Sequence, residues 1–186
     1  TDYLNYMASA QVTYNLTYGR YLKNLKPGAK KDSAMQTLYN TAMLHTKRFY
    51  NVASYGLGLY PENEGLIRQA FYLAQRLEMN DTAKVYAEKL FAMPNVKLIT
   101  DDYLTYAKLF AAMGDLPSAD KKYNEAFTMC LTQTDETRKE SETTESALKL
   151  KRLQRQLDNL KNNEDVIVNE HTRLYSEDYE RKISIA

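Results

Sequence analysis

The chain has 186 residues, with 25 basic and 24 acidic side chains and a net charge of +1. This balance gives no general attraction to nucleic acid or to an anionic membrane surface, so neither is expected as a partner. The 44% share of hydrophobic residues is enough for a core and excludes a globally disordered chain.

A single cysteine, Cys130, excludes an internal disulfide and a thiolate metal cluster within one chain. The sequence holds no long apolar run and no signal peptide, so we expect membrane attachment only through segments outside it. The sequence starts at Thr1 rather than at a methionine, and we expect a processed or excised piece of a longer protein.

Apolar residues spaced by three and four predict helices throughout, and no segment keeps the two-residue alternation of a strand. The first helix is expected over residues 2–25. The second is expected to start at Ser33, where Ser33 and Gln36 match a capping box, and to end near Gly56.

Four shorter helices are expected next. Pro61 and Pro117 each mark a helix start, because proline at the first helical position loses only an unused N–H. The expected helices run from 61 to 79, from 82 to 93, from Thr100 or Asp101 to the turn at Gly114-Asp115, and from 117 to 132.

Small residues stand where pairs of these helices should touch. Tyr103, Tyr106, Ala107 and Phe110 precede the turn at Gly114, and Ala119, Tyr123 and Ala126 follow it; a similar pattern, with Ala70, Phe71, Ala74, Ala83 and Ala87, lies 36 residues earlier. We therefore expect two helical hairpins whose helices cross at buried alanines.

Residues 103–126 resemble a tetratricopeptide (TPR) repeat, and residues 67–94 resemble a degenerate one. The chain departs from the TPR pattern at Phe71, where a small residue is usual, at Leu131, where the closing proline would stand, and in its longer period. The resemblance covers about a third of the chain. It implies an all-α fold, in which residues 1–134 form a right-handed α-solenoid of about three TPR-like hairpins.

Residues 135–186 form a second, more charged region. A helix is expected to start at Thr137, and Leu150, Leu153, Leu157 and Leu160 form a narrow apolar seam along it. Three alternatives remain at this point: a capping helix on the last hairpin, a stalk that forms a homodimer through the Leu150–Leu160 seam, or a disordered segment. The pair Asn162-Asn163 leaves open whether the region is one helix or two.

Few residues suit catalysis or metal binding. His45 lies on an apolar helical stripe and is expected in the core, His171 is expected to be solvated, and Cys130 is expected to be buried. No phosphate-binding loop or metal-ligand spacing is present in the sequence. We therefore expect no catalytic residue, no metal site and no cofactor, with a helical enzyme of an unfamiliar type as the least favoured alternative.

The TPR resemblance implies that the first helix of each hairpin lines a concave groove. Such a groove would suit an extended peptide or a small acidic ligand, unless the C-terminal helix packs there or the face is simply solvated. The groove residues implied in this way are Arg68, Gln69, Tyr72, Gln75, Arg76, Asp101, Leu104, Thr105 and Lys108.

The expected function is a non-catalytic protein-interaction or ligand-sensing domain. Hairpins that lead into a long charged helix are similar in layout to the extracytoplasmic TPR sensor regions of membrane-bound histidine kinases. That similarity favours an extracytoplasmic location over a cytoplasmic one. An intracellular TPR scaffold or adaptor is the alternative.

Overall fold

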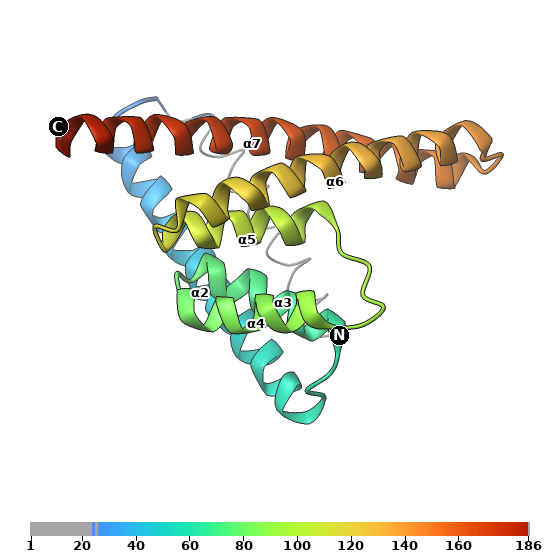
Figure 1. Ribbon diagram of the computed structural model, residues 1–186, viewed down its shortest axis with the longest axis horizontal. Coiled ribbons are helices and arrows are strands. Elements are labelled where there is room, and N and C mark those ends of the chain that lie inside the picture. The colour runs from blue at the N-terminus through green and yellow to red at the C-terminus, as the bar shows by residue number, and fades with distance from the viewer. Residues whose placement is uncertain (1–23, 25, 186) are drawn as a thin grey trace. The chain divides into compact units, whose positions relative to one another are not determined.

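A computed structural model describes residue 24 and residues 26–185, with side chains up to Ser176 (Figure 1). This part of the chain is all-α, as predicted, and contains no strand. The helix expected over residues 2–25 falls outside the described residues apart from residue 24. No described helix is both long and apolar enough to cross a membrane. The helices are α2 (Ala29–Leu59), α3 (Glu64–Arg76), α4 (Asn80–Ala92), α5 (Thr100–Ala112), α6 (Leu116–Thr143) and α7 (Ala147–Ile185).

The chain divides into two compact units, residues 1–92 and residues 93–186. The sequence placed a boundary near residue 134 instead. The difference arises because α7 packs along α6 and contacts α5, which joins the charged region to the last hairpin. Each unit is described separately below.

In the first unit, two helices start elsewhere than the sequence predicted. Helix α2 begins at Ala29, after Gly28 with φ +132°, so Ser33 lies one turn inside the helix and cannot cap it. Helix α3 begins at Glu64 rather than Pro61, because the side chain of Asn63 caps it by accepting the N–H of Leu66 at 3.0 Å.

The first unit packs around small side chains. Ala70 and Ala74 of α3 and Ala83 of α4 are fully buried, which confirms their predicted burial. Ala53 of α2 lies in the same cluster as Ala70, and the ring of Phe49 packs against that cluster. Near the start of α2, Met35 is 53% exposed and does not belong to this core.

In the second unit, α5 and α6 form a hairpin. Ala107 and Ala119 are fully buried in one core cluster, again as predicted. The carboxylate of Asp102 accepts the N–H of Ile99 at 2.9 Å at the start of α5. The carboxylate of Asp115 accepts the N–H of Ser118 at the start of α6.

The hairpins α3–α4 and α5–α6 repeat each other with a period of 36 residues. Both first helices have 13 residues, and Glu78 and Gly114 hold equivalent turn positions with positive φ. Four backbone hydrogen bonds recur at the same offset: the acceptor–donor pairs Leu73–Leu77, Gln75–Glu78, Ala74–Met79 and Met79–Ala83 match Leu109–Met113, Ala111–Gly114, Phe110–Asp115 and Asp115–Ala119. The 36-residue sequence period is therefore also a period of local structure.

The end of the chain corrects two further predictions. Helix α6 continues to Thr143 instead of ending near residue 132, and Thr137 is buried inside it rather than starting a new helix. Helix α7 is a single helix that runs through Asn162-Asn163 without a break. It lies antiparallel to α6, as the ion pair of Lys149 with Glu140 at one end and the contact of His171 with Asp120 at the other establish (Figure 1).

Helix α7 buries a stripe with a seven-residue period. Leu153, Leu160, Ile167 and Leu174 are each at most 6% exposed, whereas Leu150 is 45% exposed. The buried stripe therefore lies further towards the C-terminus than the predicted Leu150–Leu160 seam. It packs against the α5–α6 hairpin of the same chain. The packing corresponds to the capping-helix alternative.

Candidate functional site

The predicted groove residues fall into two sets, one in each unit. On α3, Gln69 and Arg76 are exposed, and Tyr72 and Gln75 are half-buried. Arg68 forms an ion pair with Glu64 at 2.7 Å on the same helix. This face of α3 therefore offers polar and aromatic surface.

The set on α5 is engaged with α7. Leu104 is 6% exposed and belongs to the core. Asp101 accepts a hydrogen bond from Asn163 at 2.8 Å, and Lys108 forms an ion pair with Glu170 at 3.0 Å. Thr105 is half-buried. Three of the four α5 residues thus stabilise the second unit instead of lining an open groove.

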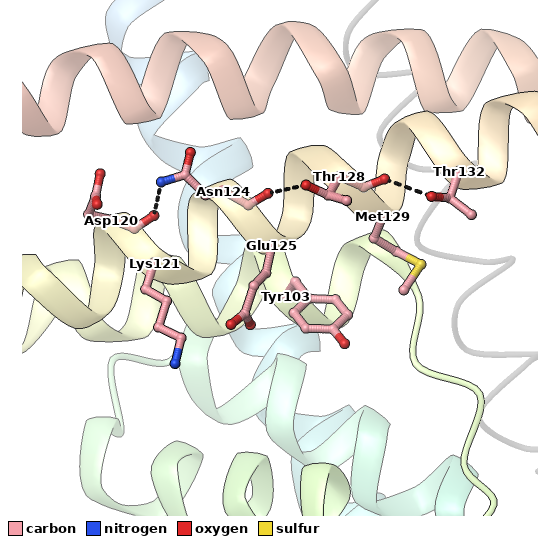
Figure 2. Close-up of a pocket in the computed structure, with 8 residues that line it drawn as sticks. All are labelled: Tyr103, Asp120, Lys121, Asn124, Glu125, Thr128, Met129 and Thr132. Carbon is pink, nitrogen blue, oxygen red and sulfur yellow. Dashed lines mark hydrogen bonds between the residues drawn. The ribbon is translucent and has the colours of Figure 1, made fainter.

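A depression of about 600 Å³ lies elsewhere on the second unit, over the outer face of α6 beside Tyr103 of α5 (Figure 2). This depression is not predicted from the sequence, because its residues are typical of the solvated side of an amphipathic helix. Its described lining residues are Tyr103, Asp120, Lys121, Asn124, Glu125, Thr128, Met129 and Thr132.

The depression is less polar than its residue types suggest. The hydroxyls of Thr128 and Thr132 donate to the carbonyls four residues back, each at 3.0 Å, and the amide of Asn124 does the same at 3.1 Å (Figure 2). Hydroxyls bound to their own helix leave the threonine methyl groups as contact surface. Together with the thioether of Met129 and the ring of Tyr103, they form an apolar patch.

Charged groups flank this patch. Glu125 forms an ion pair with Lys122 at 2.6 Å, and the Lys122 ammonium lies 5.4 Å from the ring centre of Tyr103. Burial raises the pKa of the Tyr103 hydroxyl, and the negative charge of Glu125 adds to the effect. Lys121 is exposed and offers a cation to a ligand.

Asp120 joins the depression to a polar cluster between α6 and α7. Its Oδ1 accepts a short hydrogen bond from the hydroxyl of Tyr175 and lies 2.7 Å from Nε2 of His171. The hydrogen bond from Tyr175, which has the larger effect, and the one from His171 lower the pKa of Asp120. The pKa of the Tyr175 hydroxyl is raised, because its proton is held by that carboxylate. Asp120 is therefore an anion fixed at the edge of the depression.

The same cluster corrects the prediction for His171. Its side chain is 17% exposed rather than solvated, and its ring stacks on Tyr123 with 5.2 Å between ring centres. Tyr123 in turn donates a hydrogen bond to Glu170 at 3.2 Å. A sequence signal existed, because His171 continues the heptad register of Leu160, Ile167 and Leu174.

The remaining candidates for chemistry are structural. Cys130 is fully buried, as predicted; its Sγ donates to the carbonyl of Leu160 at 3.3 Å, and burial raises the pKa of the thiol. His45 is half-buried on α2, with its ring centre 6.5 Å from that of Phe49. Within the described part of the chain, no group of three His, Cys, Asp or Glu side chains is placed to hold a metal ion.

Comparison with known proteins gives no match of this chain to a family model, to a curated protein or to a solved structure.

Proposed function

We propose that this chain is a non-catalytic, TPR-like helical repeat domain that binds a protein or peptide. The observation that carries the proposal is the repeated hairpin, with its buried alanine crossings and its four hydrogen bonds recurring every 36 residues. Repeats of this kind stack their hairpins and present extended surfaces. We take the solenoid arrangement to be part of the proposal.

The depression on α6 is the surface to which we assign binding. Its floor of methyl groups, Met129 and Tyr103 suits one apolar side chain of a peptide. Lys121 and Asp120 offer opposite charges that fix the orientation of the bound segment. The peptide that matches this chemistry best is extended and carries an apolar side chain for the floor. An acidic group close to that side chain would pair with Lys121.

The test is selection of peptides from a random library on the full chain, followed by calorimetric measurement of Kd. Replacing Thr128 and Met129 together by lysine puts two charges on the apolar floor. We expect this double variant to weaken a selected peptide by roughly tenfold or more, because the apolar contact is lost and lysine does not bury its charge.

A matched control is Lys139→Glu, an exposed change further along α6 and outside the depression. It should leave Kd unchanged. Equal affinity of the double variant and the wild type would remove the depression from the proposal. Failure to select any peptide would count against peptide binding as the function.

Two versions of the proposal differ in location: an extracytoplasmic sensor and an intracellular scaffold. Both use the same surface, and the chemistry of the depression does not separate them. Fractionation of the native source, with an antibody raised against this chain, distinguishes them by the compartment in which the protein is found.

A further inference from the structure

The connection between α6 and α7 contains no residue that opposes a helical backbone. Only Thr144, Glu145 and Ser146 join two long helices. Thr144 has an extended backbone, with φ −86° and ψ 129°, and Ser146 caps α7 by accepting the N–H of Lys149 at 3.3 Å. The three residues include no glycine, no proline and no positive φ.

The other connections of the described chain each contain a residue that opposes helix. Glu78, Asn95 and Gly114 have φ of 58°, 67° and 77° in the connections α3–α4, α4–α5 and α5–α6. The α2–α3 connection contains Pro61. A positive φ or a proline ends the helix locally, because neither fits a continuing right-handed helix. The α6–α7 reversal is held mainly by the packing of α7.

That packing is separable from the rest of the chain. Among the described helices, α7 contacts only α5 and α6. The stripe of α7 from Leu153 to Leu174 is buried. Its polar residues Asn163, Glu170 and His171 contact side chains of α5 and α6. An α7 from another molecule can make the same set of contacts, since none of them depends on the connector.

We propose that a second copy of this chain is the partner of the α5–α6 hairpin, and that two copies exchange α7 across residues 144–146. In the exchanged dimer the connector is helical, so that one helix runs from Leu116 to Ile185. Each α7 then covers the hairpin of the other copy, and the interface is two-fold symmetric. Exchange of an identical element between two copies is a low-cost route to a dimer.

A cysteine pair distinguishes exchange from other dimers. Glu140 and Lys149, each about half exposed, form an ion pair at 2.7 Å between α6 and α7 close to the connector. In the full chain carrying Cys130→Ala, the pair Glu140→Cys and Lys149→Cys is treated with a short bis-maleimide. In a monomer, or in a dimer joined by outer faces, the link stays within one chain; in the exchanged dimer it joins two chains.

The proteins are unfolded and refolded at about 10 and about 500 µM, because exchange depends on concentration. We expect chain-to-chain links that increase with concentration. Replacing Thr144, Glu145 and Ser146 by alanine favours helix and removes the Ser146 cap, so the linked dimer should increase roughly tenfold at a given concentration. Glu145→Pro should reduce it, because proline interrupts the continuous helix while Thr144 before it is already extended.

Three results would overturn the proposal. The alanine variant could give no chain-to-chain link at the higher concentration. A dimer seen by light scattering could carry only links within one chain. The proline variant could dimerise as much as the wild type.

The matched control is the change of three exposed residues of α7 to alanine: Lys151, Gln154 and Arg155. It should leave the share of linked dimer unchanged.

Discussion

Glu78 and Gly114 lie 36 residues apart and adopt the same left-handed backbone, with φ of 58° and 77°. The N–H of each donates to the carbonyl three residues earlier, at 3.1 Å in both turns. Glycine adopts this conformation without strain, whereas a residue with a Cβ is destabilised there by about 1–2 kcal/mol. The turn between α3 and α4 therefore carries strain that the turn between α5 and α6 lacks.

We predict that Glu78→Gly stabilises the protein by about 0.5–1 kcal/mol, part of the relieved strain being offset by the greater freedom of glycine in the unfolded chain. The free energy of unfolding from urea titration measures the change. Glu88→Gly, an exposed position inside α4, is the control and should destabilise by about 1 kcal/mol. A decrease in stability for both variants would show that Glu78 is not strained.

The sequence predicts the turn at Gly114 but not the turn at Glu78, because the two turns have different residues at the same position. Gly114 marks its turn directly, but Glu78 carries no turn signal, so the helix before it was expected to continue to Met79 and actually ends at Arg76. Aligning the chain with itself at the 36-residue period would have placed Glu78 opposite Gly114. Repetition therefore carried information that local residue preferences lacked.

Burial of Ala107 and Ala119 leads to a second prediction. Both are fully buried in the core of the α5–α6 hairpin, where a larger side chain has no space. Ala107→Leu or Ala119→Leu should destabilise the protein by roughly 1–3 kcal/mol through overpacking. Thermal unfolding measures the effect. Ala112→Leu, at an exposed position of α5, is the matched control and should change the melting midpoint little; equal midpoints for all three variants would contradict a close crossing.

The cluster around Asp120 makes stability depend on pH. Hydrogen bonds from Tyr175 and His171 lower the pKa of Asp120 in the folded protein, below about 3.9 for an unfolded chain. The stabilisation is therefore present above about pH 4 and is lost as pH falls through the folded pKa. Because the carboxylate is 38% exposed, we expect Asp120→Asn to destabilise by only about 0.5–1 kcal/mol at pH 7.

The measurement is the free energy of unfolding of wild type and Asp120→Asn between pH 7 and pH 2.5 or so. The difference between the two proteins should shrink below about pH 4. Thr132→Ala, an exposed α6 change that removes no titratable group, is the control, and its difference from wild type should stay constant. A difference that does not change with pH would contradict the lowered pKa of Asp120 in the folded protein.

The candidate site was less predictable than the fold. Helical periodicity and the alanines predicted an all-α chain and its buried crossings, because these depend on local spacing. The contacts of Asn163 and Glu170 could not be predicted in this way, since both are read as solvated polar residues until α5 and α6 are placed beside them. The outward methyl groups of Thr128 and Thr132 likewise depend on side-chain hydrogen bonds that residue type does not specify.

The start of α5 depends on Gln133, a contact between residues far apart in sequence. The side-chain amide oxygen of Gln133, Oε1, accepts two hydrogen bonds from Thr100. One comes from the backbone N–H at 3.1 Å and one from the hydroxyl at 2.5 Å. Thr100 is 1% exposed, so both of these donors are buried in the folded protein. We predict that Gln133→Leu destabilises the protein by about 1–3 kcal/mol, because two buried donors lose their partner. Gln133→Glu keeps an oxygen acceptor and should recover most of the loss in urea titrations at neutral pH, whereas equal loss in both variants would show that side-chain packing, rather than hydrogen bonding, is what Gln133 contributes.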